Sequence, residues 1–579
     1  MTSFFQDGPE LDNQFLDDHL LRSFLARKLP KEMHAELEPE LTRFGERVAT
    51  DILELGRQAQ LLEPEHVPYD AWGRRVDEIR VSGAWRELDR ISAEEGIVAT
   101  GYERKHGPWS RLHQFAKLYL FAPSSAVYTC PLAMTDGAAR ALELYGKSDE
   151  QARALRCLTS RDPAVFWTSG QWMTERTGGS DVGGTSTIAR PVPGDPTAFR
   201  LYGDKWFTSA TTAQMAITLA RIEGAPEGSK GLSLFYVELR DEHGRLRDIR
   251  VNRLKDKLGT RAVPTAELTL DGTPAGLVGG EGHGVRKIAS LFNITRIYNA
   301  CCAVAGMRRG LALARDYARR RVAFGKKLSE HPLHLETLAE LELEYEAGFH
   351  LTFRCVELLG RDETGAATAE ESATLRMLTP LMKLYTGRQA VASASEVLES
   401  FGGAGYVEDT GLPALLRDSQ VLSIWEGTTN VLSLDALRAI EKERAFGPFL
   451  ADLNARLAAA DRPEVGEAVA RVRAAVAKIE RYLPEAVANG QAFVEAGARS
   501  FAFALARIYA GALLCEHASW SLDHEHDARS LAVAERWCAR ELAPVIAADE
   551  AHRVASRSLA LDESLPSPAA GRERARRTA

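Results

Sequence analysis

The segments GLSLFYVEL (residues 231–239) and TAELTLDG (265–272) decide the fold class of this chain. In both segments apolar and polar side chains alternate with a period of two, as expected for half-buried β-strands. Gly and Thr are frequent between about Phe166 and Gly284, where the two segments lie. We therefore predict a β module of about 120 residues in the middle of the chain.

Helical periodicity dominates on both sides of this module. The stretch from Leu11 to about Lys147 is mostly helical in pattern, and LDNQFLDDHLLRSFLARKL (11–29) places its apolar residues near one helix face. Residues 285–321 run without proline, and further helical segments follow to about Arg444. An Ala-rich block, 450–565, predicts more packed helices, with short breaks near Pro463, Pro484 and Asp523.

The pattern predicts a mainly α chain with an inserted β domain. The predicted parts are a helical N-terminal domain (1–160), a middle β domain (161–284), a helical domain (285–445), a helical C-terminal extension (446–565) and a basic tail (566–579). For the tail, GRERARRTA, we expect disorder because it is charged and lacks apolar residues that could pack.

Composition excludes several classes of protein. A chain of 579 residues with 45% hydrophobic and 26% charged residues is typical of a globular protein of several domains. The start, MTSFFQDGPELDNQ, has neither the basic flank nor the apolar run of a signal peptide. The apolar run from Leu118 to Thr135 contains two prolines and several hydroxyls, which favours buried core over a membrane span. We expect a cytoplasmic protein without a membrane partner.

Cysteine content and net charge add two more expectations. Seven cysteines without a C-x-x-C spacing argue against a disulfide framework and against a zinc site, so we predict no metal. The formal net charge of -8 gives no general attraction to nucleic acid.

The segment QWMTERTGGSDVGGTS (171–186) opens the β module. Gly178 and Gly179 precede Ser180 and Asp181, and glycines let backbone N–H groups approach a phosphate closely. The hydroxyls of Thr174 and Ser180 can donate to a phosphate or to a flavin edge. The alternative is a polar β-turn, because short motifs of this kind also occur by chance.

Four more motifs follow in order along the chain. The first, GDKWFTSAT (203–211), places an indole beside hydroxyl donors on a strand-like run, and the second, RRRVAFGKKL (319–328), lies at a helix end. The third, SFGGAGYVED (400–409), resembles a helix C-cap. The fourth, SIWEGTTNVLSLD (423–435), carries one glutamate between a tryptophan and a turn. Each is weak alone, since a strand Trp is usually core and an Arg at a helix end is usually solvated. Their combination in this order is specific.

Together these motifs resemble the acyl-CoA dehydrogenase flavoprotein family. The resemblance rests on M-T-E-x-x-G-G-S-D-V (173–182), K-W-F-T (205–208), R-x-x-F-G (321–325), F-G-G-x-G (401–405), L-R-D (416–418) and W-E-G-T (425–428), and covers about residues 130–440. Finer features are similar to the AidB-like adaptive-response branch, namely ELDNQFLDDHLLRSFL near the start, LKDKLGTRA (254–262), SIWEGTTNVLSLDALR, and the helical block beyond residue 445.

The resemblance implies a helical N-terminal domain, a middle β-barrel and a C-terminal four-helix bundle, here followed by the helical extension. It implies a homotetramer that holds FAD between barrel and bundle. The matching cofactor positions in one subunit are Met173, Thr174, Gly179, Ser180, Trp206, Thr208, Ser209, Thr428 and Asn430, and those that a neighbouring subunit lends are Arg321, Phe324, Gly402 and Gly403. Positions expected at the acyl-CoA substrate are Ser180, Arg296, Trp425 and Gly427.

The same resemblance gives Glu426 the role of catalytic base. A carboxylate at this place removes the α-proton of an acyl-CoA while hydride leaves the β-carbon for the flavin, and an α-proton is so weakly acidic that the base needs a raised pKa. Some members carry the base in the segment matching FNITRI (292–297), which here offers Asn293, Thr295 and Arg296 but no carboxylate. The alternative for Glu426 is an ordinary first-turn acid favoured by the helix dipole.

Two rival functions share these motifs. An acyl-CoA oxidase would pass its electrons to oxygen instead of to an electron-transfer flavoprotein or another acceptor. A DNA-associated protein protecting against alkylation, with weak or vestigial dehydrogenase activity, is the rival from another class. Residues 451–579 contain 17 basic and 18 acidic residues, whereas a DNA-binding face needs basic excess. We therefore keep DNA as a partner that we do not favour.

Overall fold

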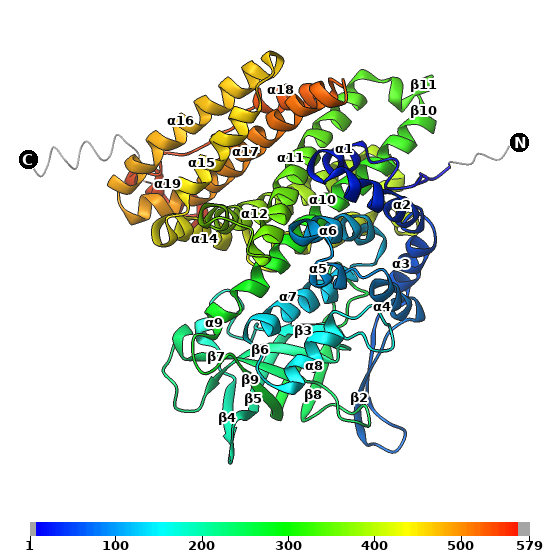
Figure 1. Cartoon of the computed structure of the whole chain (residues 1–579), viewed down its shortest axis with the longest axis vertical. Coiled ribbons are helices and arrows are strands. Elements are labelled where there is room, and N and C mark those ends of the chain that lie inside the picture. Colours follow the sequence, from blue (N-terminus) through cyan, green and yellow to red (C-terminus); the bar gives the residue numbers. More distant parts are fainter. Residues whose placement is uncertain (1–6, 566–579) are drawn as a thin grey trace, which may run out of the picture.

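The computed structural model describes residues 7–565, and the predicted basic tail (566–579) lies outside the described residues. Apart from one short hairpin at the far end, the strands gather at one end of the molecule and helices form the rest, with the C-terminal helices toward the end opposite these strands (Figure 1). The predicted fold class, a mainly helical chain with a β domain inserted in its middle, is confirmed.

The β domain is a closed barrel with two added strands. Strand β6 pairs with β4, β4 with β5, β5 with β9, β9 with β7, and β7 again with β6, so the sheet closes on itself. The predicted runs 231–239 and 265–272 become β7 and β9, as their alternation indicated. The strands are β3 (Ser169–Trp172), β4 (Ile188–Val192), β5 (Asp195–Ser209), β6 (Met215–Ile222), β7 (Leu232–Glu238), β8 (Ile249–Leu254) and β9 (Thr265–Val278).

The N-terminal block starts later than the helical pattern suggested. The prediction that residues 11–29 form one helix face is wrong for its first part, because the side chain of Asn13 accepts the amides of Phe15 and Leu16 and makes a turn. Asp18 then caps the first helix by accepting the amide of Leu21. The helices of this block are α1 (His19–Lys28), α2 (Lys31–Arg47), α3 (Asp51–Leu61), α4 (Gly83–Glu94), α5 (Ala99–Glu103), α6 (Ser110–Phe121), α7 (Thr129–Tyr145) and α8 (Asp149–Leu158).

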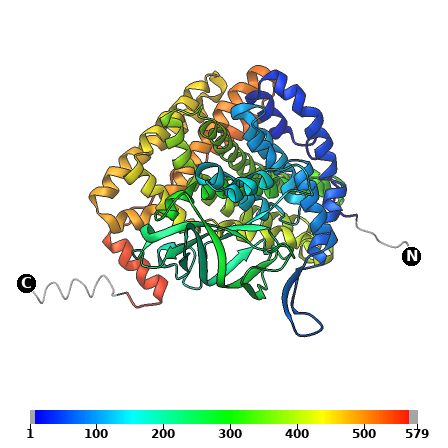
Figure 2. The ribbon, with the colours of Figure 1, turned by 60° about the horizontal axis from the view of Figure 1, so that its bottom comes forward.

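A β-hairpin interrupts this helical block and was not predicted. Strands β1 (Glu65–Tyr69) and β2 (Arg75–Arg80) project from the body, as Figure 2 shows. The carboxylate of Asp70 accepts the amides of Trp72 and Arg74, and Gly73 has a φ of 76°, so the turn between the two strands is closed by local contacts. Trp72, at the tip, is 92% exposed.

The second helical block contains the four-helix bundle. Helices α10, α11, α12 and α14 contact one another in sequence order, and a small hairpin of β10 (Val322–Ala323) and β11 (Lys326–Lys327) joins α10 to α11. The helices are α9 (Gly284–Lys287), α10 (Ala289–Arg320), α11 (Pro332–Glu363), α12 (Ala369–Ser400), α13 (Pro413–Gln420) and α14 (Thr429–Glu443).

The C-terminal extension is helical, as predicted, but one predicted break is misplaced. Pro484 lies inside α16, and the chain breaks instead at Asn489 and Gly490, where Gly490 takes a φ of 92°. Glycine allows this left-handed conformation without steric cost. The helices are α15 (Phe446–Ala459), α16 (Gly466–Ala488), α17 (Gln491–His524), α18 (Arg529–Cys538) and α19 (Glu550–Leu561).

One apolar core joins the N-terminal helices, the bundle and the extension. Phe24 of α1 packs edge-on against Phe349 of α11 at 5.4 Å, and Tyr385 of α12 contacts Phe503 of α17 at 5.9 Å. Among residues 7–565, α17 alone is long and apolar enough to suit a membrane span, but 78% of its most apolar window is buried in the protein. The run from Leu118 to Thr135 is also mostly buried, as expected for core.

Candidate active site

Glu426 lies in a sharp turn between α13 and α14. Its φ of 57° is left-handed, and Gly427 follows with a φ of 106°. Helix α14 begins only at Thr429, with Thr428 as its N-cap, so Glu426 precedes the helix. The alternative that Glu426 is an ordinary first-turn acid is therefore wrong.

The Glu426 carboxylate is held where barrel and bundle meet. Thr295 of α10 donates its hydroxyl to one carboxylate oxygen at 2.7 Å, and the Gln171 amide of β3 lies 3.5 Å from the other. The carbonyl oxygen of the Gln171 side chain is buried without a hydrogen-bond partner in the described residues. Buried acceptors usually have a hydrogen-bond donor, so the unpaired Gln171 oxygen indicates that a further polar group donates to it when the site is filled.

Burial raises the pKa of Glu426 above its ordinary value. Thr295, Arg296, Lys383 and Gln171 oppose the rise by hydrogen bonds and positive charge, but desolvation is larger. A half-buried carboxyl with a raised pKa is suited to accept a proton near neutral pH.

Arg296 braces the backbone of this turn. Its Nε donates to the carbonyl of Glu426 at 3.2 Å, and its Nη1 pairs with Asp435 of α14 at 2.8 Å. Arg376 of α12 binds the other oxygen of Asp435 at 2.7 Å. We predicted Arg296 at the substrate; in the structure its described contacts are with the Glu426 turn and α14, so the substrate contact stays a prediction.

Trp425 is fixed by α10. Its indole N–H donates to the side-chain oxygen of Asn299, whose amide donates to the carbonyl of Leu422 at 3.1 Å. The ring is half-buried against the main core. These contacts hold Trp425 next to Glu426, and the substrate contacts predicted for Trp425 and Gly427 stay predictions.

The Gly-Gly-Ser loop lies at the surface beside the barrel. Gly178 has a φ of 126°, and a Cβ on Gly179 would lie 2.6 Å from the Thr174 hydroxyl. The carbonyl of Thr174 accepts the amide of Trp206 at 3.0 Å, which joins the two predicted motifs. Residues 178–180 are exposed; the Gly178 amide donates to the carbonyl of Glu175 at 3.0 Å, whereas the amides of Gly179 and Ser180 have no protein acceptor in the described residues and can approach a phosphate.

A buried ion pair under this loop was quoted in the motifs but given no role. Lys205 and Glu175 form an ion pair at 2.8 Å, with side chains 0% and 3% exposed. Glu175 also accepts the amide and hydroxyl of Ser186 and the hydroxyl of Thr187. Burial opposes ionisation of Glu175, but Lys205 and these donors lower its pKa to about 2. The pair thus pins the loop to β5.

The remaining predicted barrel positions line β5 and its approach. The Trp206 ring is half-buried, with the Lys255 ammonium 3.6 Å from its centroid. Thr208 is buried and donates to the carbonyl of Ala266 at 2.7 Å, while the Ser209 hydroxyl lies 3.1 Å from that of Thr265. Met173 is 6% exposed and belongs to an apolar cluster. Among these residues, Trp206 therefore offers a partly exposed aromatic ring.

Arg321, Phe324, Gly402 and Gly403 gather at one end of the bundle. Tyr317 and Phe401 pack at 4.9 Å and bring the end of α10 to the end of α12. The β10–β11 hairpin, with Phe324 98% exposed, lies at the opposite end of the molecule from the barrel (Figure 1). A single chain therefore does not bring these residues to the Gly-Gly-Ser loop.

The two cofactor positions after Glu426 differ in their contacts. Thr428 caps α14 with its backbone and is exposed. Asn430 is also exposed, and its side-chain oxygen accepts from Arg499 of α17 at 3.1 Å. The extension thus reaches the edge of the predicted site.

Sequence reasoning missed several residues around Glu426. Gln171 is the first residue of the quoted segment 171–186 but was given no role, and Thr295 was considered only as a non-carboxylate. Lys383 of α12, which donates to the carbonyl of Gly427 at 2.6 Å, gave no signal in the sequence. Asp418 of the L-R-D motif accepts the amide of Thr260 at 2.6 Å and so ties two motifs together.

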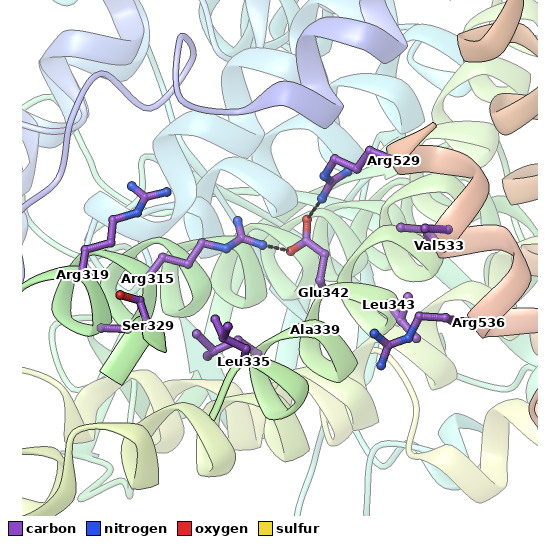
Figure 3. Close-up of a pocket in the computed structure, with 13 residues that line it drawn as sticks. Arg315, Arg319, Ser329, Leu335, Ala339, Glu342, Leu343, Arg529, Val533 and Arg536 are labelled. Carbon is purple, nitrogen blue, oxygen red and sulfur yellow. Dashed lines mark hydrogen bonds and ion pairs between the residues drawn. The ribbon is translucent and has the colours of Figure 1, made fainter. Parts of the chain in front are cut away.

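A hollow in the described residues lies away from this site. It measures about 400 Å³ and opens where α10, α11 and α18 meet (Figure 3). Glu342 lies at its centre, bound by Arg315 and Arg529, and Leu335 and Val533 line it. None of its lining residues is a predicted site residue.

The sequence of the chain matches known protein families. Four family descriptions match: the AidB N-terminal domain (residues 9–162), the acyl-CoA dehydrogenase middle domain (170–273) and C-terminal domain (282–441), and an acyl-CoA dehydrogenase 11 C-terminal domain-like region (444–565). Acyl-CoA dehydrogenase family member 11 of Caenorhabditis elegans is 46% identical over 93% of this chain and 89% of its own length. The chain belongs to the acyl-CoA dehydrogenase family.

The AidB-like branch is confirmed as well. The putative acyl-CoA dehydrogenase AidB of Escherichia coli is 32% identical over 73% of this chain and 77% of its own. The crystal structure of Caenorhabditis elegans ACDH-11 in complex with C11-CoA superposes with a TM-score of 0.94 at 44% identity and covers 98% of both chains. A Bacillus anthracis acyl-CoA dehydrogenase complexed with FAD shares the fold at 19% identity, with a TM-score of 0.69 over 92% of this chain and 90% of that chain. FAD is the cofactor of this family.

Proposed function

We propose that this chain α,β-dehydrogenates an acyl-CoA thioester with Glu426 as the general base. The observation that carries the proposal is the Glu426 carboxyl itself, half-buried at the barrel–bundle junction with a raised pKa. The nearby segment from α10 supplies Thr295 as a hydrogen-bond donor and no rival carboxylate.

Glu426 would take the α-proton of the thioester. The reaction needs donors for the enolate oxygen that forms, and the backbone N–H of Glu426 donates to no protein acceptor among residues 7–565. The left-handed turn at Glu426 and Gly427 turns this N–H away from any helix ladder. Thr295 keeps the carboxylate aimed, so base and oxyanion donor come from one residue.

The residues present fit FAD. A Cβ at Gly179 would lie 2.6 Å from the Thr174 hydroxyl, so glycine allows the loop to pack closely on Thr174. The exposed amides of Gly179 and Ser180 have no protein acceptor in the described residues, and Trp206 offers a half-buried aromatic ring. Met173, Thr174, Ser180, Thr208, Ser209, Thr428 and Asn430 would complete the contacts from the same subunit. Bound FAD would supply the hydride acceptor for the β-carbon.

A second subunit would complete the site. Arg321, Phe324, Gly402 and Gly403 follow the ends of α10 and α12, which Tyr317 and Phe401 bring together. The β10–β11 hairpin at this end lies at the opposite end of the molecule from the barrel (Figure 1). We propose that these four residues serve a neighbouring copy in a homotetramer, and that an electron-transfer flavoprotein collects the electrons. The similarity to a relative solved with C11-CoA supports a medium-length acyl chain.

Anaerobic titration with acyl-CoAs tests the proposal. The purified protein should carry FAD, and a panel of short, branched and medium acyl-CoAs should bleach the flavin absorbance with at least one member. Glu426→Gln should keep FAD bound and abolish bleaching. Absence of flavin, or bleaching that survives in Glu426→Gln, would refute the assignment. Adding oxygen or electron-transfer flavoprotein after bleaching distinguishes an oxidase from a dehydrogenase.

A further inference from the structure

Lys383 of α12 is a buried cation that the proposed reaction does not use. The residue is 0% exposed, and its ammonium donates to the carbonyl of Gly427 at 2.6 Å. No other hydrogen bond of this ammonium occurs among residues 7–565, although it has three protons to donate. Burying an ammonium with so few partners costs several kcal/mol, so its retention needs a reason.

The contact falls on the strained part of the catalytic turn. Glu426 and Gly427 are consecutive residues with φ values of 57° and 106°. A left-handed conformation costs a non-glycine residue about 1–2 kcal/mol and persists only where neighbours fix it. Two carbonyls of this turn are fixed by cations, that of Glu426 by Arg296 at 3.2 Å and that of Gly427 by Lys383. Helices α10 and α12 thus clamp the turn from two sides.

The charges around Lys383 make its role different from that of Arg296. Arg296 already has Asp435 as an ion-pair partner at 2.8 Å. Lys383 has no direct ion pair in the described part of the chain, and the charged groups that act on it are Glu426 and Arg296. Burial lowers the pKa of Lys383 to about 7, against the opposing attraction of Glu426. Its positive charge also counteracts the burial that raises the pKa of Glu426.

We propose that Lys383 is a positioning residue for Glu426, which fixes the Glu426–Gly427 turn through the Gly427 carbonyl and favours the ionised, proton-accepting form of the carboxyl. This inference rests on the proposed function of Glu426 as a base. Lys383 itself is buried behind the turn and acts through Glu426 instead of touching substrate.

Two substitutions separate the two parts of this role. Lys383→Met removes both the charge and the donor to Gly427, whereas Lys383→Gln removes the charge and keeps a donor. Lys117→Met is the matched control, because Lys117 is another fully buried lysine, paired with Glu40 and Glu95 far along the chain from Glu426. Its loss tests what the removal of a buried ammonium does to the protein in general.

The first readout is the ionisation of Glu426 without any turnover. The infrared band of its protonated carboxyl is isolated by subtracting the spectrum of the matching Glu426→Gln protein, and followed against pH. Loss of a nearby opposite charge should move the Glu426 titration to higher pH by about one unit or more in both Lys383 variants. In Lys117→Met the titration should not move.

The second readout is the pH dependence of flavin bleaching, in which the acidic limb should move to higher pH by the same amount. A folded Lys383→Met and a folded Lys383→Gln with the wild-type Glu426 titration would overturn the proposal, as would an equal shift in Lys117→Met. If the wild-type flavin is never bleached, the proposed function fails; the infrared titration still decides on its own whether Lys383 controls Glu426.

Discussion

At the scale of single residues, Glu426 combines a strained backbone with an unfavourable charge. Its backbone is left-handed, and burial raises its pKa from the ordinary 4.5. Thr295 and Gln171 compensate only in part, since one hydrogen bond is 2.7 Å and the other 3.5 Å long. Such local costs are typical of functional sites, where the fold supplies the stability elsewhere.

Glu426→Gln should therefore stabilise the protein, and more so at higher pH. Because the folded pKa of Glu426 is raised, the stability linked to its neutral form is present below pH 4.5 and lost as pH rises through the folded pKa. The gain should grow by about 1.4 kcal/mol for each pKa unit of the shift. Thermal unfolding midpoints between pH 5 and 8 measure it. A difference that does not depend on pH would contradict this account.

At the scale of elements, the Lys205–Glu175 pair holds the Gly-Gly-Ser loop on the barrel. Glu175 has a pKa lowered to about 2, so the pair contributes stability above the unfolded value of 4.5 that is lost as pH falls toward 2. The pair explains why each of the two motifs contains a charged residue. Glu175 of M-T-E belongs to the loop, and Lys205 of K-W-F-T, on β5, holds that loop in place.

Lys205→Met should unfold the loop and lower FAD content together. Removing one partner of a buried pair leaves an uncompensated charge and costs about 3–5 kcal/mol. The double variant Lys205→Met, Glu175→Gln should recover part of the thermal stability, because the buried charge is then gone. Flavin content per subunit and the unfolding midpoint are the measurements. Lys205→Met with normal flavin content would show that the loop needs no anchor.

At the scale of the whole molecule, we propose that the exposed end of the bundle meets the barrel of a neighbouring subunit. Phe324 is 98% exposed, a large apolar side chain presented by a short hairpin. Exposed apolar side chains grouped with cofactor motifs mark an interface. In one chain this end lies away from the barrel (Figure 1).

Phe324→Asp should weaken assembly and FAD binding while leaving the chain folded. A charge at an apolar contact is desolvated without a partner and costs several kcal/mol. Light scattering should show smaller assemblies, and flavin content should fall in parallel. Leu561→Asp is the control, since Leu561 is another exposed apolar residue, 55% exposed on α19. An unchanged tetramer with full flavin would contradict the shared site.

The extension should be essential for folding of the bundle. Phe449 and Tyr509 of the extension pack at 5.1 Å, and Trp537 contacts Tyr385 of α12 at 6.3 Å, all within the common core. A chain ending at residue 445 would expose this face of α11 and α12 to water, and we expect it to aggregate. A chain ending at residue 565, which keeps every described contact, should fold. Soluble yield and near-ultraviolet circular dichroism measure the outcome.

The sequence by itself determined the fold class, the family and the place of Glu426. The alternation of apolar residues in a strand and their helical repeat both involve residues close together in the chain, so β7, β9 and α10 could be predicted from neighbouring residues. The β1–β2 hairpin was missed because its alternation is short and its side chains are mostly exposed. Pro484 was misjudged because packing of α16 outweighs the cost of an interior proline.

Only the tertiary structure decided what surrounds Glu426. Gln171, Thr295 and Lys383 come from β3, α10 and α12, which are far apart in the chain, and no local pattern records their meeting. The same holds for the bond between Asp418 and Thr260. A pKa depends on the burial and charges that distant elements bring together, so the sequence could single out Glu426 as the proposed base but not the groups that shift its pKa.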